Sequence, residues 1–268
     1  MSSAALGLAL GAAVLHALWN LLLAGSRDVL AATAVALGSS LVVALPFAIA
    51  TWGIERAAIP WLVASGALEL LYFFTLTAAY QRAELSLVYP LARGGAPVLV
   101  LLGAVATGYD PDAIEVLGVL AVAAGVVLVR GLRGGDRLGA VLGLLIAGQI
   151  AAYTLVDAEG VEHANPAPYL LLALLPAAVA AAAVSGRARV RAAWSTRAVL
   201  AGCGGFLAYV LVLAALRLAP AAPVAAVRET SVLFAVALAA PFLGERVTRA
   251  RLAGAVLVVT GVVALGSA

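Results

Sequence analysis

Four charged residues lie inside long apolar runs of this 268-residue sequence, and their chemistry needs an explanation. Two are acidic, Glu69 and Glu229, and two are basic, Arg93 and Arg228. A charged side chain at the middle of a membrane helix costs about 2.5–3.5 kcal/mol on insertion scales. We therefore expect the four residues to face a polar interior, where they can bind a substrate, carry a proton or pair with one another.

Glu69 shares a predicted helical face with Tyr72 and Tyr80, because their spacing fits the helical repeat. Away from water a carboxylate favours its protonated form, so Glu69 is a candidate for a proton-coupling site. The alternative interpretations are a structural ion pair with Arg93 or Arg228, and a position beside a water-filled vestibule.

Arg93 shares a predicted face with Tyr89, and Pro97 cannot donate to the Arg93 carbonyl, which predicts a kink beside the arginine. The planar guanidinium suits the anionic group of a substrate or a gating pair with an acid. A permanent structural role is the alternative. Arg228 occupies the matching place in the second half of the chain. Because adjacent residues point about 100° apart on a helix, we expect Arg228 to face inward and Glu229 to face a neighbouring helix.

Two aromatic residues are each followed by a small hydrogen-bonding residue, in the pairs Trp19-Asn20 and Tyr153-Thr154. A ring beside an amide or hydroxyl suits a pocket for an amphipathic molecule. Hydrogen bonding between helices and a position at the membrane interface are the alternatives. His16 is a further candidate, as a proton relay. The predicted substrate-binding set is Trp19, Asn20, Tyr72, Tyr89, Arg93, Tyr153, Thr154 and Arg228.

The composition indicates which elements position these residues. Apolar residues make up 65% of the chain and charged residues 11%, whereas soluble domains hold about 45–50% and about 25%. A water-soluble globular domain is therefore excluded. A membrane-spanning helix needs about 20 mainly apolar residues, and ten such runs occur, each too long for a barrel strand. The predicted fold class is an all-α membrane protein with ten transmembrane helices, near residues 4–24, 29–51, 60–80, 85–107, 113–130, 138–158, 168–184, 198–217, 222–243 and 250–267.

The two halves of the chain resemble each other. An arginine inside a run of the first half matches one in the second half, and three glycines match likewise. The pairs are Arg93 with Arg228, Gly108 with Gly244, Gly118 with Gly254 and Gly125 with Gly261. We predict two five-helix repeats, residues 1–132 and 133–268, which an odd number of spans places in opposite orientations. The binding site is then expected where the halves meet. The glycines indicate close helix packing, and they leave either a monomer or a homodimer open.

The basic residues are distributed unevenly. All 16 are arginines, and twelve fall in connections after odd-numbered runs, whereas the opposite connections hold only Arg56 and Arg217. By the positive-inside rule the first group faces the cytoplasm, so we expect both termini outside. The twelve are Arg27, Arg82, Arg130, Arg133, Arg137, Arg187, Arg189, Arg191, Arg197, Arg246, Arg249 and Arg251.

Several functions are disfavoured by what the sequence offers. A net charge of +3 gives no reason to expect a nucleic-acid partner. One cysteine and two histidines make a metal site a poor expectation, and we expect no cofactor. We also expect no enzymatic activity, because paired Asp-rich motifs, a Gly-x-Ser-x-Gly serine and a His-Glu zinc helix do not occur. The alternative function is an intramembrane enzyme acting on a lipid-linked substrate.

Five motifs together resemble the EamA-type branch of the drug/metabolite transporter superfamily. They are His16-Ala-Leu-Trp-Asn20, Leu85-Ser-Leu-Val-Tyr-Pro-Leu-Ala-Arg93-Gly, Ala152-Tyr-Thr-Leu-Val-Asp157, Ala225-Ala-Val-Arg228-Glu and Leu243-Gly-Glu245-Arg. The resemblance implies a ten-helix inverted-repeat carrier that moves small metabolites or amphipathic compounds by alternating access. It also implies export, coupling to protons or exchange, and a place in the lipid bilayer of the bacterial cytoplasmic (inner) membrane. Many relatives are drawn with both termini in the cytoplasm, which differs from the orientation that the arginines predict.

Overall fold

The computed structural model describes residues 1–23, 26–83, 85–131, 137–243 and 248–267. For Tyr80, Leu85, Ser86, Arg130 and residues 238–243 it describes the backbone only. The predicted repeat boundary at residues 132 and 133 lies outside the described residues. The same holds for Arg133, Gly244, Glu245 and Arg246 of the sequence patterns.

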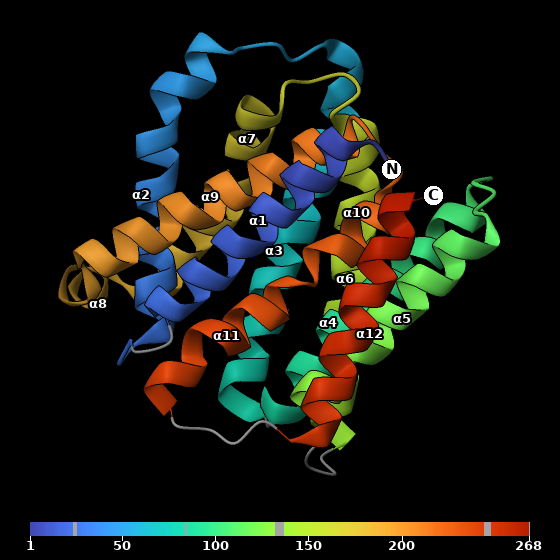
Figure 1. Ribbon diagram of the computed structural model, residues 1–268. Coiled ribbons are helices and arrows are strands. Elements are labelled where there is room, and N and C mark those ends of the chain that lie inside the picture. Colours follow the sequence, from blue (N-terminus) through green and yellow to red (C-terminus); the bar gives the residue numbers. More distant parts are fainter. Residues whose placement is uncertain (24–25, 84, 132–136, 244–247, 268) are drawn as a thin grey trace.

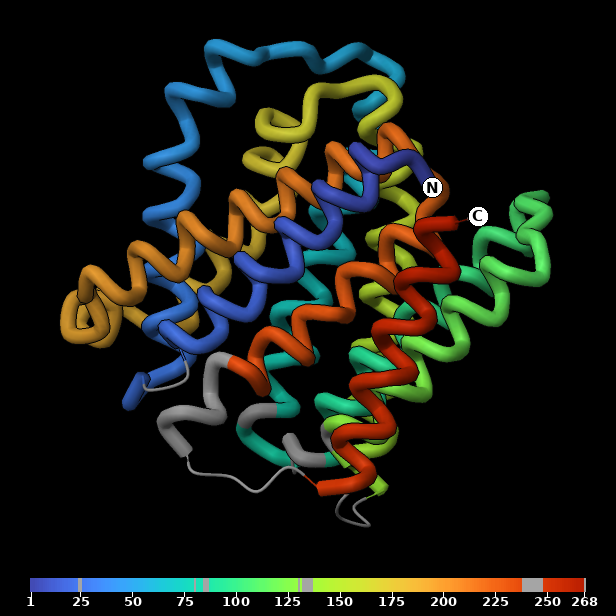
Figure 2. Tube along the Cα trace, in the orientation of Figure 1, coloured from blue at the N-terminus to red at the C-terminus, as the bar shows by residue number. Residues whose placement is uncertain are grey.

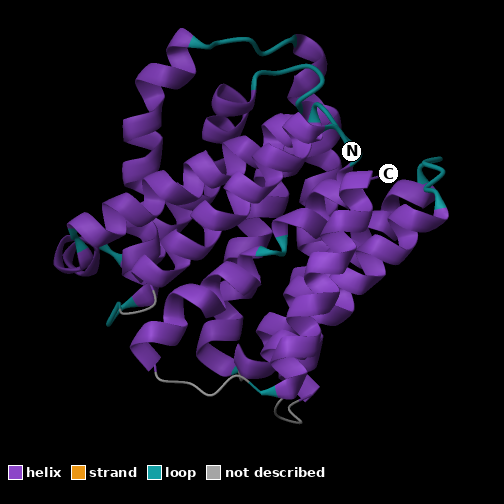
Figure 3. Cartoon of the chain, in the orientation of Figure 1, coloured by secondary structure: helices purple, strands orange, loops and turns teal. Residues whose placement is uncertain are grey.

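Twelve α-helices and one short 3-10 helix, η1, occur in the described part of the chain (Figure 1). In chain order they are α1 (Ser3–Leu23), α2 (Val29–Ala50), η1 (Arg56–Ala58), α3 (Ile59–Arg82), α4 (Leu85–Ala106), α5 (Ala113–Arg130), α6 (Arg137–Gly160), α7 (Pro166–Ser185), α8 (Arg187–Ala193), α9 (Thr196–Leu216), α10 (Ala221–Arg228), α11 (Ser231–Leu243) and α12 (Arg249–Ser267). Figure 3 shows that helix dominates the described chain. The all-α prediction is confirmed.

Local sequence signals explain where several helices begin. Asp28 and Asp112 immediately precede α2 and α5. The Asp28 carboxylate accepts a hydrogen bond from the backbone N–H of Ala31 at 3.1 Å, and the Asp112 carboxylate accepts one from the backbone N–H of Glu115 at 2.8 Å. These bonds satisfy N–H groups that have no partner inside the helix. Pro60 and Pro166 stand in the first turns of α3 and α7, where a missing N–H is harmless. Helix α4 runs through Pro97, so the proline does not end it.

The ninth predicted run is interrupted, which the sequence reading missed. We expected one helix near 222–243, but α10 ends at Arg228 and α11 begins at Ser231. The backbone N–H of Thr230 donates to the Val227 carbonyl at 3.0 Å, and the Thr230 hydroxyl donates to the same carbonyl at 2.8 Å. Ser39 and Ser40 make the same kind of bond, to the carbonyl three residues back, within the unbroken α2, so the Thr230 hydroxyl bond accompanies the break without explaining it. The break lies immediately beside Glu229.

Eight of the described helices are long and apolar enough to cross a membrane, so the chain is an integral multi-pass membrane protein. They lie in Ser3–Leu23, Val29–Ala50, Arg56–Ala79, Leu87–Ala106, Arg137–Gly160, Pro166–Ser185, Thr196–Leu216 and Arg249–Ser267. Ala113–Val129 is a shorter apolar helix, and the break divides α10 from α11. The prediction of an all-helical membrane protein is thus confirmed, whereas the ten spanning helices in two inverted repeats are not.

The helices pack mainly in pairs drawn from opposite halves of the chain. In Figure 2, α1 and α9 run side by side, as do α5 and α12. Helix α3 packs against α6 and α7, and α2 packs against α7 and α9. Helix α4 packs against α6, while α1 packs against α10 and α11. The N-terminal ammonium donates to the Leu265 carbonyl at 3.2 Å, so the two ends of the chain lie together.

The glycines matched between the halves form the contact of α5 with α12. A Cβ added to Gly125 would lie 2.6 Å from the Gly254 carbonyl oxygen, and one added to Gly118 would lie 3.1 Å from the Gly261 carbonyl oxygen. Glycine is needed here because a side chain would push the two helices apart. These glycine faces therefore pack against each other within one chain, which leaves them covered and unsuitable as the homodimer face considered from the sequence.

Candidate functional site

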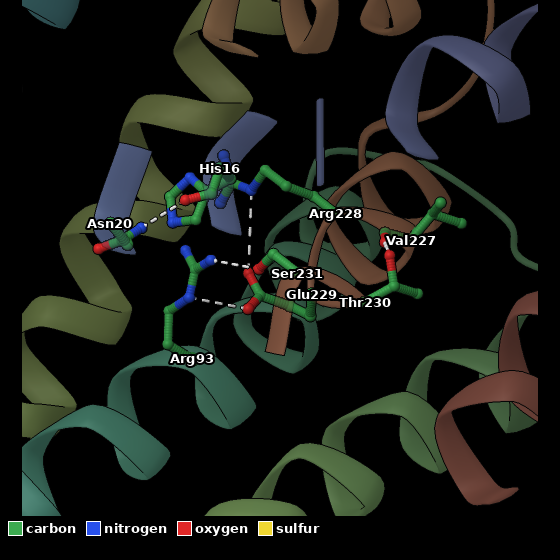
Figure 4. Close-up of polar contacts among 8 residues, drawn as sticks. All are labelled: His16, Asn20, Arg93, Val227, Arg228, Glu229, Thr230 and Ser231. Atoms are coloured by element: carbon green, nitrogen blue, oxygen red, sulfur yellow. Dashed lines mark hydrogen bonds and ion pairs between the residues drawn. The ribbon is translucent and has the colours of Figure 1, made fainter. Parts of the chain in front are cut away.

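The break between α10 and α11 brings Glu229 against α4. The Arg93 Nε lies 2.9 Å from the Glu229 Oε2, and the Arg93 Nη2 donates to the Ser231 hydroxyl at 2.9 Å. The Arg93 guanidinium also stacks over the Tyr89 ring, 5.9 Å from its centroid. Glu229 is fully buried and Arg93 is 7% exposed. An ion pair away from water thus joins the first half of the chain to the second (Figure 4).

Arg228 approaches the same carboxylate from a different direction (Figure 4). Its Nε lies 3.8 Å from the Glu229 Oε1, and the residue is 3% exposed. We expected the neighbouring side chains of Arg228 and Glu229 to diverge, as they do on a regular helix. The expectation was wrong, because α10 ends at Arg228 and the interrupted backbone lets both side chains turn to one place.

Three predicted residues of α1 lie near this cluster. The His16 ring lies beside the guanidinium groups in Figure 4, within electrostatic range of both Arg93 and Arg228. It meets Trp19 edge to face, with ring centroids 5.0 Å apart. Asn20 donates its side-chain amide to the His16 carbonyl at 2.7 Å, so one amide donor is used within the helix. All three side chains are half-buried.

A row of tyrosines connects three helices next to the arginines. Tyr72 of α3 meets Tyr153 of α6 edge to face at 5.9 Å, and Tyr153 meets Tyr209 of α9 at the same centroid distance. Such contacts are favourable for aromatic rings and hold them in fixed orientations. The ring of Tyr153 is buried, while Tyr72 and Tyr209 are half-buried. The structure therefore brings together Tyr72 and Tyr153 of the predicted set and adds Tyr209.

Asp157 is a buried acid whose importance the sequence reading missed. Its Oδ2 accepts from the Tyr209 hydroxyl at 2.6 Å and its Oδ1 from the Tyr169 hydroxyl at 3.1 Å, and the residue is 1% exposed. Its neighbours Tyr153 and Thr154 were predicted to bind substrate, but Asp157 was not. The available signal was its position four residues after Tyr153, one helical turn along the same face.

Glu69 and Thr154 differ in their surroundings. Glu69 is half-buried, and in the described part of the chain no arginine nitrogen lies within 4.0 Å of its carboxylate, so no ion pair with Arg93 or Arg228 forms there. It remains within electrostatic range of Asp157 and Arg228. Thr154 is fully buried and its hydroxyl donates to the Ile150 carbonyl of its own helix at 2.6 Å. The Thr154 hydroxyl proton is therefore donated within its own helix and not to a neighbouring one.

The arrangement is suited to binding and charge pairing. Two guanidinium groups, one carboxylate and a row of aromatic rings offer a polar centre with apolar walls, which is the composition of a small-molecule site. Among the described residues, no group of three or more His, Cys, Asp or Glu side chains is placed to hold a metal ion.

Comparison with known proteins finds a family match over the second half of the chain and a shared fold over its length. Residues 137–267 match the EamA-like transporter family. A solved structure described as "Crystal structure of protein" is 16% identical, covers 98% of this chain and 98% of its own, and superposes with a TM-score of 0.75. At that identity the likeness shows a shared fold over the whole length. No curated protein matches the chain in sequence. The second half of the chain is thus similar in sequence to EamA-like transporters.

Proposed function

We propose that this protein is a secondary transporter that moves a small metabolite or amphipathic compound by alternating access. Residues 1–132 and 133–268 are its two inverted repeats, and the substrate binds where they meet. The bilayer is that of the bacterial cytoplasmic membrane, and the direction is export, coupled to protons or run as exchange. The family match to a transporter family supports this proposal and gives no support to the enzyme alternative.

The helix contacts support the inverted repeat. If the halves correspond, α1 to α5 match α6, α7, α9, the pair of α10 and α11, and α12. When each helix is replaced by its counterpart in the other half, the contact of α1 with α9 corresponds to the contact of α6 with α3, and both are present. In the same way, the contact of α2 with α9 corresponds to that of α7 with α3. The contact of α4 with α6 corresponds to that of the α10 and α11 pair with α1. The contacts of α2 with α7 and α5 with α12 map onto themselves.

The observation that carries the proposal is the buried Arg93 and Glu229 ion pair at a broken helix. The pair joins one helix of each half, with 2.9 Å between Nε and Oε2. Broken helices at the repeat interface are where transporters of inverted-repeat design bind substrate. A buried ion pair is stable only while its geometry is intact. Movement of one half against the other therefore either keeps the Arg93 and Glu229 pair or breaks it, which gives two distinct states.

The first experiment identifies a substrate by stability and then by flux. The purified full-length protein is heated with each member of a metabolite library, since a ligand that binds only the folded state raises the melting temperature. Compounds that do so are tested for counterflow in proteoliposomes loaded with the same compound. We expect at least one stabilising compound to exchange across the membrane. Stabilisation by several compounds with no exchange of any of them would contradict a transporter.

Proton coupling at Glu69 is the second part of the proposal. Glu69 lies within electrostatic range of a second acid, Asp157, and such neighbours disfavour two negative charges at once. We expect Glu69→Gln to abolish the stimulation of flux by a pH gradient while leaving counterflow intact. The matched control is Glu162→Gln, which makes the same change at an exposed position. Unchanged gradient-driven flux in Glu69→Gln would refute the coupling role and leave the transporter standing.

A further inference from the structure

The two buried arginines have unequal hydrogen bonding. Arg93 donates its Nη2 to the Ser231 hydroxyl at 2.9 Å, and its Nε lies 2.9 Å from the Glu229 Oε2 in a close ion pair, although that Nε makes no hydrogen bond to a described residue. Arg228 makes only a longer contact with the same carboxylate. Its Nε lies 3.8 Å from the Glu229 Oε1, too far for a hydrogen bond, and its Nε and Nη2 have no hydrogen-bond partner among the described residues.

The two unpaired donors belong to one edge of the guanidinium. Nε and Nη2 point their N–H bonds in parallel, and this edge is one of the two that bind both oxygens of a carboxylate at once. Arg228 is 3% exposed, so water does not replace the missing partners freely. Buried N–H donors of a charged group that lack hydrogen bonds are unfavourable, and an anion in direct contact would satisfy them.

The charged groups around Arg228 do not supply that anion in this conformation. Among the described residues, Glu229 is the one acid whose carboxylate lies within 4.0 Å of Arg93 and Arg228, so two guanidinium groups share one carboxylate. Both oxygens of Asp157 accept from tyrosine hydroxyls. No arginine nitrogen of the described residues lies within 4.0 Å of the Glu69 carboxylate. The acid nearest to the free edge is therefore Glu229, which lies too far away for a hydrogen bond.

We propose that Arg228, rather than Arg93, binds the substrate, and that the substrate is a small organic monocarboxylate. This inference rests on the proposed transport function. The carboxylate takes the Nε and Nη2 edge of Arg228, while Arg93 and Glu229 stay paired and hold α4 to the broken helix. The apolar body of the substrate packs on Tyr153 and Tyr209, which lie within electrostatic range of Arg228 and meet edge to face at 5.9 Å. A monocarboxylate fits because one edge of the Arg228 guanidinium can bind one carboxylate through two hydrogen bonds, and the aromatic rings suit an apolar group attached to it.

Matched probes test the ligand class. The purified full-length protein is titrated with phenylacetate and hexanoate, with neutral phenylacetamide and with cationic phenethylamine, and binding is measured by calorimetry. We expect one or both carboxylates to bind and the amide and the amine to fail. Absence of binding by both carboxylates, or equal binding of phenylacetamide, overturns the proposal.

Variants test the residue. We expect Arg228→Gln to weaken carboxylate binding about tenfold or more, because a hydrogen-bonded charged partner is lost. Arg228→Lys keeps the charge without the fork, so it also binds more weakly than the wild type. Arg197→Gln makes the same change on an exposed arginine and serves as the control. Size-exclusion profiles verify folding, and Arg228→Lys carries the test if the Gln variant aggregates. Wild-type affinity in a folded Arg228 variant overturns the proposal.

Measurements of flux distinguish the carboxylate site at Arg228 from the proposed transport function. A carboxylate that binds through Arg228 but does not exchange in proteoliposomes sustains the anion site and contradicts transport. Exchange of a neutral or cationic compound, with no carboxylate binding, overturns the anion site and sustains transport.

Discussion

Glu229 is the residue on which the two buried arginines converge. It is fully buried and lies 2.9 Å from Arg93 and 3.8 Å from Arg228, between the nearest nitrogen and oxygen atoms. A buried carboxylate in this position is held by the attraction of both cations, and each cation depends on it in turn. Sequence reasoning identified the three charges but placed Glu229 away from the arginines.

Removing the charge of Glu229 should therefore destabilise the protein. We expect Glu229→Gln to lower the free energy of unfolding by about 3–5 kcal/mol, because breaking a buried pair leaves uncompensated charge. Thermal unfolding of the purified protein measures the change. The exposed Glu162→Gln is the control. If Arg93→Gln combined with Glu229→Gln is no more stable than the single variants predict by addition, the two residues are not coupled.

At the scale of elements, close approach of helices depends on small residues at defined places. Gly125 of α5 and Gly254 of α12 each present their carbonyl to the other's missing side chain. The sequence could predict that these glycines pack closely, because they are matched between the halves. It could not predict that they pack within one chain, because nothing in the pattern specifies the partner helix.

An added methyl group tests the glycine contact. A Cβ at residue 125 would lie 2.6 Å from the Gly254 oxygen and 2.9 Å from the Val258 nitrogen, so Gly125→Ala must separate the backbones. We expect a loss of about 1–3 kcal/mol in the free energy of unfolding. Gly148→Ala is the matched control, since no atom lies within 4 Å of its added Cβ. Equal melting temperatures for the two variants would contradict this account of the α5 and α12 contact.

A second element contact lies outside the spans. Arg189 of α8 binds Asp28, the residue before α2, through Nε at 2.8 Å and Nη2 at 2.9 Å. The Arg189 hydrogen bond lowers the pKa of the Asp28 carboxyl below its ordinary value. A carboxyl whose pKa is lower in the folded than in the unfolded state stabilises the fold at pH values above its ordinary pKa. This stabilisation is lost as the pH falls from the ordinary pKa through the lowered pKa of the folded state.

The pH dependence of this contact follows from that sign. We expect wild type to be slightly more stable than Asp28→Asn near pH 7 and the difference to vanish as the pH falls below the ordinary carboxyl range. Melting temperatures across that pH range measure it. Arg191→Gln, an exposed change on the same helix, provides a control without the ion pair. A difference between wild type and Asp28→Asn that stays constant with pH would exclude the ion pair as its cause.

At the scale of the whole molecule, the arginines of alternate connections predict the orientation in the membrane. The two ends of the chain lie together, as the hydrogen bond from the terminal ammonium to the Leu265 carbonyl shows. An orientation that puts one end outside therefore puts both outside, in line with the arginine distribution.

A reporter fused to the C-terminus tests this orientation. We expect a reporter that is active only in the cytoplasm to give no signal, and one that is active only outside to give a signal. Fusion after Arg191, in a connection rich in arginine, is the control with the opposite expectation. A cytoplasmic signal from the C-terminal fusion would reverse the orientation and leave the fold unchanged.

The membrane class, the helix limits and the identity of the polar residues within the spans could be predicted from the amino-acid sequence. These follow from local properties, namely the length of apolar runs, capping residues and the cost of charge in lipid. Nine of the ten predicted runs became single helices, and only the ninth was divided, beside Glu229.

Only the tertiary structure decided which polar groups meet. Arg93 and Ser231 are 138 residues apart, and Asp157 and Tyr209 are 52 apart. Their pairing depends on how helices from the two halves pack, and helical periodicity carries no information on that packing. The break between α10 and α11 likewise leaves no mark on the pattern of apolar residues. For this reason the fold class could be read from the chain, whereas the free edge of Arg228 became visible only with its neighbours in place.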